Sequence, residues 1–265
     1  MIYTIVPVRN EENSIESTLK MLLKTKTDKV LILLNGSTDN TLNKLSKICS
    51  DKIELICFNK PLGLDVPRAI GAYFAYKEKA SAFIFVDGDM KGDISSNIND
   101  IIIDISKNKV DMALTNCYPH LYRNNNLSKV LLAFRKQFNI ELGIFNKIGY
   151  AIPSHGPHGI SKKLLETVGF KSIAVPPISL ALAVKNGLNI KISTEIPNYK
   201  LGSNIKDEFH AKQIAKTIIG DCIEALSIYR DEKARRGFND TVFLGYHKNR
   251  RFDILEFIIN AELKN

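Results

Sequence analysis

The sequence predicts an α/β protein: a mostly parallel sheet flanked by helices, followed by a C-terminal helical extension. Short apolar runs rich in β-branched residues recur in the first half of the chain, at residues 2–6, 30–34, 53–58, 82–86 and 110–114. Helical patterns lie between these runs, at residues 13–23, 40–49, 66–79 and 96–107. Strands that alternate with helices at this spacing form a parallel sheet covered by helices.

The second half of the chain has a different pattern. Residues 127–145 are typical of an amphipathic helix, with an apolar stripe formed by Leu131, Phe134, Phe138, Leu142 and Phe145. We expect this stripe to pack on the protein's own core; an acceptor groove, a membrane contact and a dimer seam are the alternatives. A long helix over 205–236 and a short one over 252–263 are expected to follow. We therefore divide the chain into a main domain, residues 1–200, and a helical extension, residues 201–265, packed on it.

The composition indicates a folded protein with a basic surface. Hydrophobic residues make up 45% of the 265, which is enough for a core and excludes wholesale disorder. Lys and Arg outnumber Asp and Glu by 37 to 28, and this excess attracts anions such as nucleotides, phosphates or anionic lipid. The excess is spread along the chain apart from one cluster at 247–251, and the chain lacks the aromatic–basic interleaving of nucleic-acid-binding modules. We therefore expect no nucleic-acid partner.

The expected location of the protein is the cytoplasm. The four cysteines form no C-x-x-C pair and three of them lie in apolar segments, which favours buried thiols in a reducing compartment. The N-terminal residues lack the pattern of a signal peptide, and no run approaches the roughly 18 apolar residues that cross a bilayer. A peripheral contact at the inner face of the membrane is the alternative, and the oligomeric state is left open.

Two carboxylates follow the fourth apolar run directly, in the segment Asp87-Gly88-Asp89. Like charges this close repel each other, so the pair costs stability unless a cation lies between them. The end of a strand places both carboxylates at the sheet edge where α/β proteins bind ligands, and Gly88 would let a ligand approach the backbone. Hard oxygen ligands suit Mg²⁺ or Mn²⁺ bridging a diphosphate. A solvated turn is the alternative, and the local sequence alone favours neither.

Other polar segments follow the neighbouring strands. P-V-x-N-E-E comes after the first run, N-G-S-T-D-N-T after the second, and a G…R…G segment that contains Arg68 after the third. Together with D-G-D, and in this order, they resemble the family 2 glycosyltransferases of the GT-A fold over roughly residues 2–115. The resemblance implies a UDP- or GDP-sugar donor and a Mn²⁺ or Mg²⁺ ion at the D-x-D motif.

The resemblance also assigns roles to individual residues. The nucleotide base and ribose would contact Pro7, Val8, Arg9 and Glu11. Asn35 occupies the position of an aspartate that faces the base in many members, with Asp39 in the same loop, and this change leaves the identity of the base open. Arg68 would lie over a phosphate or pair with a carboxylate. Asp87 would face the ribose or the metal, and Asp89 would hold the metal on the diphosphate.

The second half departs from the family pattern. Inverting members often carry an acidic pair before a helix, and its second carboxylate is the general base; here Pro176 and Pro177 stand in that place. His155 and His158, in a glycine-rich loop before a helix, are the candidate catalytic residues, with His158 preferred. A histidine can act as a base near neutral pH or complete a metal site, and the late His247 is the rival metal ligand. Transfer with retained configuration would need no dedicated base.

We therefore predict a metal-dependent glycosyltransferase that moves a sugar from a nucleotide diphosphate to a polysaccharide, lipid-linked or small-molecule acceptor. A catalytically degenerate sugar-nucleotide- or carbohydrate-binding protein is the alternative, because the acidic pair is missing. A nucleotidyltransferase is the second alternative, although the first strand lacks the glycine-rich basic loop that such an enzyme needs. The cluster of Asp207, Glu208 and His210 is assigned to a helix start, where the helix dipole favours acidic side chains.

Overall fold

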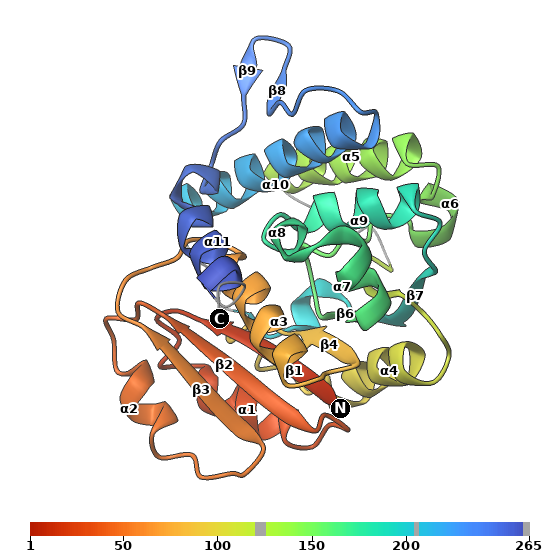
Figure 1. Cartoon of the computed structure of the whole chain (residues 1–265). Helices are drawn as coiled ribbons and strands as arrows, with labels where there is room; N and C mark the ends of the chain where they lie inside the picture. Colours follow the sequence, from red (N-terminus) through yellow and green to blue (C-terminus); the bar gives the residue numbers. More distant parts are fainter. Residues whose placement is uncertain (120–125, 204–206, 262–265) are drawn as a thin grey trace.

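The computed structural model describes residues 1–119, 126–203 and 207–261, and its main feature is a seven-stranded sheet with the order β3-β2-β1-β4-β6-β5-β7 (Figure 1). The strands are β1 (Ile2–Val8), β2 (Lys29–Asn35), β3 (Ile53–Phe58), β4 (Ala82–Phe85), β5 (Met112–Asn116), β6 (His158–Ser161) and β7 (Ile190–Glu195). Strand β6 runs antiparallel to β4 and β5, whereas the other neighbouring pairs are parallel. The predicted mostly parallel sheet is confirmed.

Both faces of the sheet are buried, which explains the continuous apolar runs of the first half. The helices between the first strands are α1 (Ile15–Leu22), α2 (Thr41–Leu45), α3 (Val66–Lys77) and α4 (Ser95–Ser106). Along β2, Leu31 and Leu33 belong to the core that contains α3, whereas Val30 and Ile32 belong to the core that contains α1 and α4. Because successive side chains of a strand point to opposite faces, the positions of β2 between its ends, residues 30–34, are all apolar.

The second half of the chain adds helices on the α3 side of the sheet (Figure 1). They are α5 (Asn126–Glu141), α6 (Phe145–Ile148), α7 (Lys162–Val168), α8 (Phe170–Ile173), α9 (Pro176–Lys185), α10 (Glu208–Tyr229) and α11 (Phe252–Ala261). Helix α10 packs on α5 and α9, and α11 packs on α3 and α8. Short 3₁₀ turns, η1 (Asn198–Lys200) and η2 (His247–Asn249), and a hairpin of β8 (Gly237–Phe238) and β9 (Thr241–Val242) complete the chain.

The long C-terminal helix is shorter than predicted. The sequence pattern suggested residues 205–236, whereas α10 spans Glu208–Tyr229. The helix stops because Asp231 adopts a left-handed backbone with φ 59°, and the chain then enters the hairpin. The predicted residues 205–206 and 262–263 lie outside the described residues.

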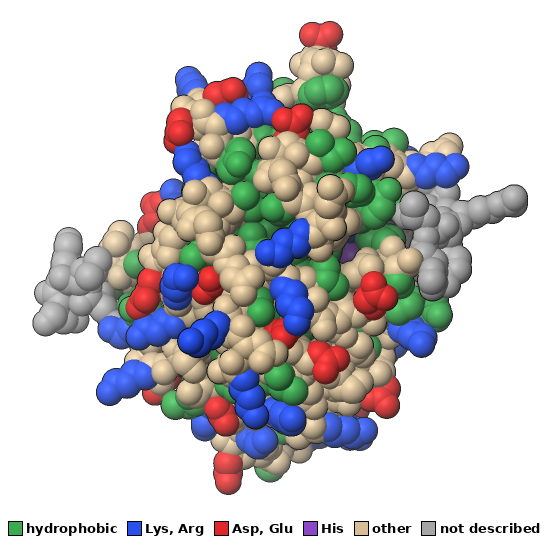
Figure 2. Space-filling model, turned by 90° about the vertical axis from the view of Figure 1, so that its right-hand side faces the viewer, with side chains coloured by type: hydrophobic (Ala, Val, Ile, Leu, Met, Phe, Trp, Pro, Cys, Tyr) green, Lys and Arg blue, Asp and Glu red, His purple; other side chains and the backbone are tan. Residues whose placement is uncertain are grey.

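The apolar stripe of α5 packs within the protein. The helix predicted over 127–145 ends at Glu141, and Phe145 begins α6 instead. Phe138 of α5 and Leu142, just after it, are buried in the main core, and Leu131 packs against it. Phe134 meets Phe238 and Phe243 edge-to-face, with ring centroids 5.9 and 5.8 Å apart. In the described part of the chain, every helix is too short or too polar to cross a bilayer. On the face shown in Figure 2, basic and acidic side chains are interspersed.

The expectation of buried thiols is correct for two of the four cysteines. Cys117 and Cys222 are buried, whereas Cys49 and Cys57 are exposed. Cys57 lies on β3, one of the two edge strands of the sheet, and its side chain reaches solvent. Burial raises the pKa of the thiols of Cys117 and Cys222 to about 12, so these two stay protonated and weakly nucleophilic.

Candidate active site

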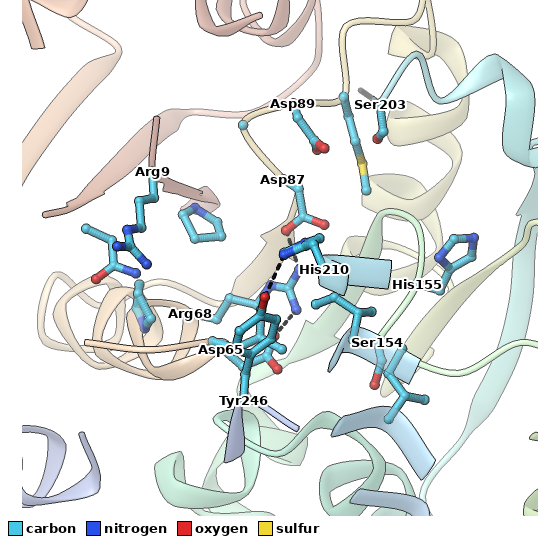
Figure 3. Close-up of a pocket in the computed structure, with 18 of the residues that line it drawn as sticks. Arg9, Asp65, Arg68, Asp87, Asp89, Ser154, His155, Ser203, His210 and Tyr246 are labelled. Carbon is cyan, nitrogen blue, oxygen red and sulfur yellow. Dashed lines mark hydrogen bonds and ion pairs between the residues drawn. The ribbon is translucent and has the colours of Figure 1, made fainter. Parts of the chain in front are cut away.

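A cavity of about 840 Å³ lies at the carboxyl ends of β1, β2 and β4 (Figure 3). It gathers most of the residues that the sequence assigned to the donor: Pro7, Val8, Arg9, Glu11, Asn35, Arg68, Asp87 and Asp89. They converge because parallel strands end at the same edge of the sheet. The opposite wall comes from the second half of the chain and includes Ser154, His155, Asn198, His210 and Tyr246.

Asp39 connects two loops and does not line the cavity. One oxygen of its carboxylate accepts hydrogen bonds from the backbone N–H of Thr41 (3.1 Å) and its hydroxyl (2.6 Å), and the other accepts from the N–H of Glu12 (3.1 Å). Burial favours the neutral carboxyl, but these hydrogen bonds outweigh it and lower the pKa of Asp39. The loop after β2 is thereby fixed against the loop after β1.

The amide of Asn35 holds the loop after β3. Its Oδ1 accepts from the backbone N–H of Leu62 at 2.6 Å, and its Nδ2 donates to the carbonyl of Gly63 at 3.2 Å. An aspartate could accept the first hydrogen bond but could not donate the second. The structure therefore gives a local reason for the asparagine at this position, independent of the base.

Arg68 connects Asp87, a candidate metal ligand, to Asp65 at the start of α3. Its Nη1 donates to Asp65 Oδ1 and its Nη2 to Asp87 Oδ1, and Arg68 and Asp65 are both buried. Burial alone would lower the pKa of the guanidinium, but the carboxylates of Asp87 and Asp65 raise it, so Arg68 is charged. The pairing with a carboxylate is one of the two roles that the sequence suggested for Arg68.

Gly88 is required by packing. A Cβ at this position would lie 2.9 Å from Val8 Cγ2 and 3.2 Å from the carbonyl oxygen of Pro7. The carbonyl of Gly88 accepts a hydrogen bond from Thr18 Oγ1 at 2.9 Å. The glycine thus allows the turn between Asp87 and Asp89 to lie directly on the end of β1, a reason that differs from the expected approach of a ligand.

The two candidate catalytic histidines lie in different surroundings. His158 is in β6, is 5% exposed, and stacks on Phe85 rather than lining the cavity. His155 lines the cavity and stacks on Tyr118, with ring centroids 5.5 Å apart. The pKa of each imidazole is lowered to about 3, chiefly by burial, with the charge of Arg135 acting on His155 and that of Arg68 on His158. The catalytic role of either remains a prediction.

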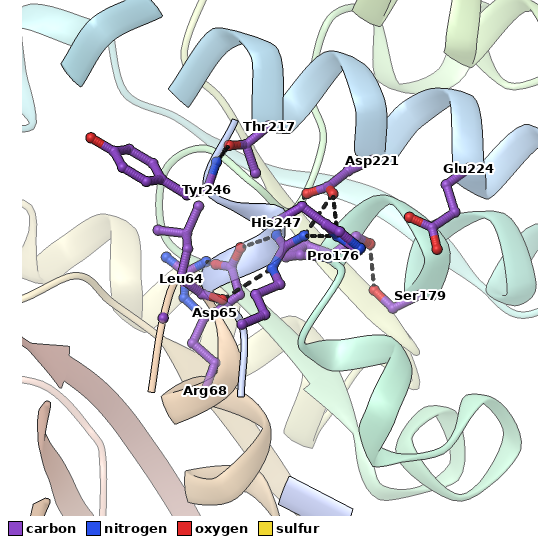
Figure 4. Close-up of polar contacts among 12 residues, drawn as sticks. Leu64, Asp65, Arg68, Pro176, Ser179, Thr217, Asp221, Glu224, Tyr246 and His247 are labelled. Atoms are coloured by element: carbon purple, nitrogen blue, oxygen red, sulfur yellow. Dashed lines mark hydrogen bonds and ion pairs between the residues drawn. The ribbon is translucent and has the colours of Figure 1, made fainter. Parts of the chain in front are cut away.

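His247 lies beside a different group of acids. Its Nδ1 is 4.0 Å from Asp221 Oδ1 and 3.1 Å from Arg250 Nη1, and Glu224 is close by (Figure 4). This group does not suit a metal, because arginines occupy both oxygens of Asp221 and Arg236 also pairs with Glu224. In Asp87, by contrast, Arg68 pairs with Oδ1 alone. His247 is not among the cavity-lining residues, so the structure does not bring it to the cavity wall that carries Asp87 and Asp89.

His210, which the sequence analysis assigned to a helix start, also lies at the cavity. It lines the cavity from the first turn of α10, and its Nδ1 lies 2.9 Å from the Tyr246 hydroxyl. Asp207 caps the same helix by accepting a hydrogen bond from the N–H of His210 at 2.8 Å, as expected for a helix start. The packing of α10 on α5 and α9 places His210 at the cavity. A local sequence pattern does not predict that packing.

Pro176 and Pro177 form the first turn of α9, where the acidic pair would stand. The neighbouring helix α10 supplies Asp221 to the cavity wall, but this carboxylate accepts from Arg236 and Arg250 at 2.7 Å each. Arg250 also donates to its second oxygen at 2.7 Å, so neither oxygen is left to accept from the hydroxyl of an acceptor. Asp221 therefore does not replace the missing base.

A buried arginine, Arg135, lies behind the cavity wall that contains Ser154 and His155. Arg135 on α5 is 1% exposed, and among the described residues no carboxylate pairs with it. Its guanidinium lies 5.6 Å from the centroid of the Tyr118 ring, the ring that also stacks on His155. Within the described part of the chain, Arg135 Nε, Ser154 Oγ and His155 Nε2 are buried without hydrogen-bond partners. Such atoms are rare in folded proteins and favour a polar ligand nearby.

The mostly parallel seven-stranded sheet, with the cavity at the carboxyl ends of β1, β2 and β4, has the GT-A fold of glycosyltransferases. A model of glycosyl transferase family 2 matches residues 3–169, more than half of the chain. The chain belongs to this family. No curated protein matches the sequence significantly.

Solved structures confirm the fold. Glucosyl-3-phosphoglycerate synthase from Mycobacterium tuberculosis, in complex with Mn²⁺, UDP and phosphoglyceric acid, superposes with a TM-score of 0.58 at 16% identity, covering 84% of this chain and 78% of that chain. Its complex with Mn²⁺, UDP-glucose and phosphoglyceric acid gives 0.61 at 14% identity, with 86% and 80% covered. A further mycobacterial protein gives 0.60 at 15% identity, with 86% and 75% covered.

Proposed function

We propose that the chain transfers a sugar from a UDP-sugar to a small anionic acceptor, with a divalent cation held by Asp87 and Asp89. The observation that carries the proposal is the convergence of these two carboxylates with the loops after β1, β2 and β3 around one cavity. The family match over residues 3–169 supports glycosyl transfer. The Mn²⁺, UDP and UDP-glucose complexes of structural neighbours support the metal and the base.

The residues present fit a hard divalent cation. Asp87 and Asp89 offer carboxylate oxygens from the two sides of Gly88, and both line the cavity. Mg²⁺ and Mn²⁺ take oxygen ligands of this kind and leave other positions to phosphate oxygens. When bound, such an ion would neutralise charge on the leaving diphosphate. Arg68 orients the Asp87 carboxylate, and His210 reaches the same cavity from the opposite wall.

The residues of the opposite cavity wall support an anionic acceptor. The unpaired charge of Arg135 lies behind Tyr118 and His155, and Ser154 and His155 present buried polar atoms without partners among the described residues. A phosphate or carboxylate near this wall would compensate the guanidinium and accept these hydrogen bonds. The phosphoglyceric acid bound by structural neighbours agrees with this acceptor class.

Calorimetric titration of UDP, GDP and their glucose and mannose conjugates, with and without Mn²⁺, tests the proposal. We expect binding of UDP and a UDP-sugar that depends on Mn²⁺, and at least tenfold weaker binding of GDP. Equal binding with and without the metal would contradict the metal site. Binding of GDP alone would change the donor but keep the site.

The catalytically degenerate alternative rests on one observation, the prolines at the start of α9. It predicts Mn²⁺-dependent UDP binding without turnover. Release of UDP from a bound UDP-sugar, followed over hours with 3-phosphoglycerate, inorganic phosphate or water as acceptor, distinguishes the two functions. Any release above that of an Asp89→Asn variant excludes the degenerate form.

A further inference from the structure

Arg250, in the C-terminal segment, contacts two residues that line the proposed donor site, Leu64 and Asp65. The Arg250 side chain is fully buried, and each of its five N–H groups has a partner. Nε donates to the carbonyl of Leu64 at 3.1 Å; Nη1 faces Asp221 Oδ1 at 2.7 Å and His247 Nδ1 at 3.1 Å. Nη2 donates to Asp221 Oδ2 at 2.7 Å and Asp65 Oδ2 at 2.9 Å. Such a set of contacts leaves the guanidinium a single position.

Asp65 divides its carboxylate between two arginines. Oδ2 accepts from Arg250, and Oδ1 accepts from Arg68, which in turn donates to Asp87. The backbone of Asp65 is left-handed with φ 63°, a conformation that a non-glycine residue keeps only when its surroundings hold it. Arg250 supplies that hold with two contacts, to the side chain of Asp65 and to the carbonyl of Leu64.

The backbones of the two segments are also closely fitted. A Cβ on Gly63 would lie 2.7 Å from the carbonyl carbon of Asn249 and 2.8 Å from the Cα of Arg250. The loop after β3 therefore rests directly on the segment that carries Arg250. The same loop receives the hydrogen bonds of Asn35 at Leu62 and Gly63, so one side of the cavity is fixed from both halves of the chain.

We propose that Arg250 is a positioning residue of the donor site: through Asp65 it holds Arg68 against Asp87, so that the metal-binding carboxylate keeps its orientation. This inference rests on the proposed function, because it assigns the metal–nucleotide complex to Asp87 and Asp89. It makes donor affinity depend on a residue 185 positions away from Asp65 along the chain, in a segment outside residues 3–169 that match the family model.

Arg236 provides a matched control. It also donates to Asp221 Oδ1 at 2.7 Å and to Glu224 at 2.5 Å, and it is buried, but it makes no contact with Asp65. A lysine at either position keeps one positive charge near Asp221 and loses the planar fork. If Arg250 acts only by neutralising Asp221, Arg250→Lys and Arg236→Lys should behave alike. If it positions Asp65, only Arg250→Lys should affect the donor.

The experiment measures Mn²⁺-dependent UDP binding by calorimetry, with urea midpoints to confirm folding. Arg250→Lys should raise the Kd for UDP in the presence of Mn²⁺ about tenfold or more, whereas Arg236→Lys should change it less than twofold. Asp65→Asn should weaken binding to a similar extent, and the Arg250→Lys/Asp65→Asn double variant should be little weaker than either single one, because both interrupt the same contact.

The outcomes separate the two proposals. Equal weakening by Arg250→Lys and Arg236→Lys, or unchanged affinity in Arg250→Lys, overturns the positioning role while leaving the proposed function intact. Additive losses in the double variant overturn the route through Asp65. Absence of Mn²⁺-dependent UDP binding by the wild-type chain overturns the proposed function and the positioning role with it.

Discussion

The imidazole of His158 lies against the ring of Phe85, with ring centroids 4.9 Å apart and planes inclined by 25°. The two residues are direct partners in the antiparallel pairing of β6 with β4, two positions before Asp87. The stack fixes the end of β4 and encloses the imidazole, which is only 5% exposed. His158 thus supports the carboxylate segment by packing, and its burial has a measurable consequence for stability.

We predict that the protein loses stability in mildly acidic solution partly through His158. Burial and then the charge of Arg68 lower its pKa from 6.5 to about 3, so the folded imidazole stays neutral while the unfolded one takes up a proton below pH 6.5. The unfolded state then binds more protons, and the free energy of unfolding falls as pH decreases from about 6.5 towards 3, with a slope of about 1.4 kcal/mol per pH unit for one such group. Urea unfolding at pH 7 and pH 5 measures this slope.

A His158→Leu variant is the comparison for that measurement. It should be less stable at pH 7, because the stacked ring is lost, yet its stability should change less between pH 7 and pH 5 than that of the wild type. The same pH dependence in both proteins would show that His158 is not the group responsible.

Asp89→Asn should abolish Mn²⁺-dependent UDP binding while leaving the fold intact, because an amide is a far weaker metal ligand than a carboxylate. We expect the Kd to rise by at least a hundredfold in calorimetry. Asp93→Asn is the control: Asp93 is exposed in the same turn region and accepts a hydrogen bond from Ser95 Oγ at 3.3 Å. Equal loss in both variants would attribute the effect to net charge rather than to a ligand position.

The sequence correctly placed the residues of the proposed donor side at one edge of the sheet, because its signal there is local. A polar segment that follows an apolar strand must lie at the sheet edge, and this places Asp87, Asn35 and Arg9 at the cavity without any tertiary information. The contacts that each of these side chains makes were harder to predict from the sequence. Asn35 was predicted to face the base, and its amide is engaged with Leu62 and Gly63 of a loop far along the chain.

The arrangement of the opposite cavity wall could not be predicted from the sequence, because it depends on how distant segments pack. Strand β6 is four residues long and lies between β4 and β5, so no alternating pattern showed that His158 belongs to a strand. His155 lies in the loop that precedes this strand and lines the cavity. His210 and Arg250 depend on how α10 and the last segment dock, which a local pattern does not encode.

His155→Ala should lower turnover more than His158→Leu, since only His155 lines the cavity. We expect a decrease of kcat of about tenfold or more for His155→Ala and of less than threefold for folded His158→Leu. The pKa of His155 is lowered to about 3, so a rate–pH profile should show no inflection near 6.5 from this residue. Near-normal rates in both variants would return both histidines to structural roles.

Arg135→Met should leave the fold at least as stable as the wild type while weakening the acceptor. Arg135 is a buried charge without a paired carboxylate among the described residues, and an apolar side chain of similar length removes its desolvation cost. Arg250→Met is the contrast: it deprives Asp65 and Asp221 of a shared partner and should cost about 3–5 kcal/mol in urea unfolding.

The activity of Arg135→Met completes that test. Its KM for an anionic acceptor such as 3-phosphoglycerate should rise about tenfold, whereas transfer to a neutral acceptor such as glycerol should be little changed. A similar rise in KM for both acceptors would mean that Arg135 maintains the shape of the cavity wall but does not select an anionic acceptor.

We predict that transfer proceeds with retention of the anomeric configuration, because the described cavity lacks a carboxylate suited to act as base. Asp65 and Asp221 are held by arginines, Glu11 accepts from Ser14 Oγ at 2.7 Å, and Asp87 and Asp89 are assigned to the metal. Proton NMR of the first product formed from an α-linked UDP-sugar gives the answer through the coupling constant of its anomeric proton. An α-linked product agrees with the prediction. A β-linked product would require a base, and the two histidines that line the cavity, His155 and His210, would be the first residues to substitute.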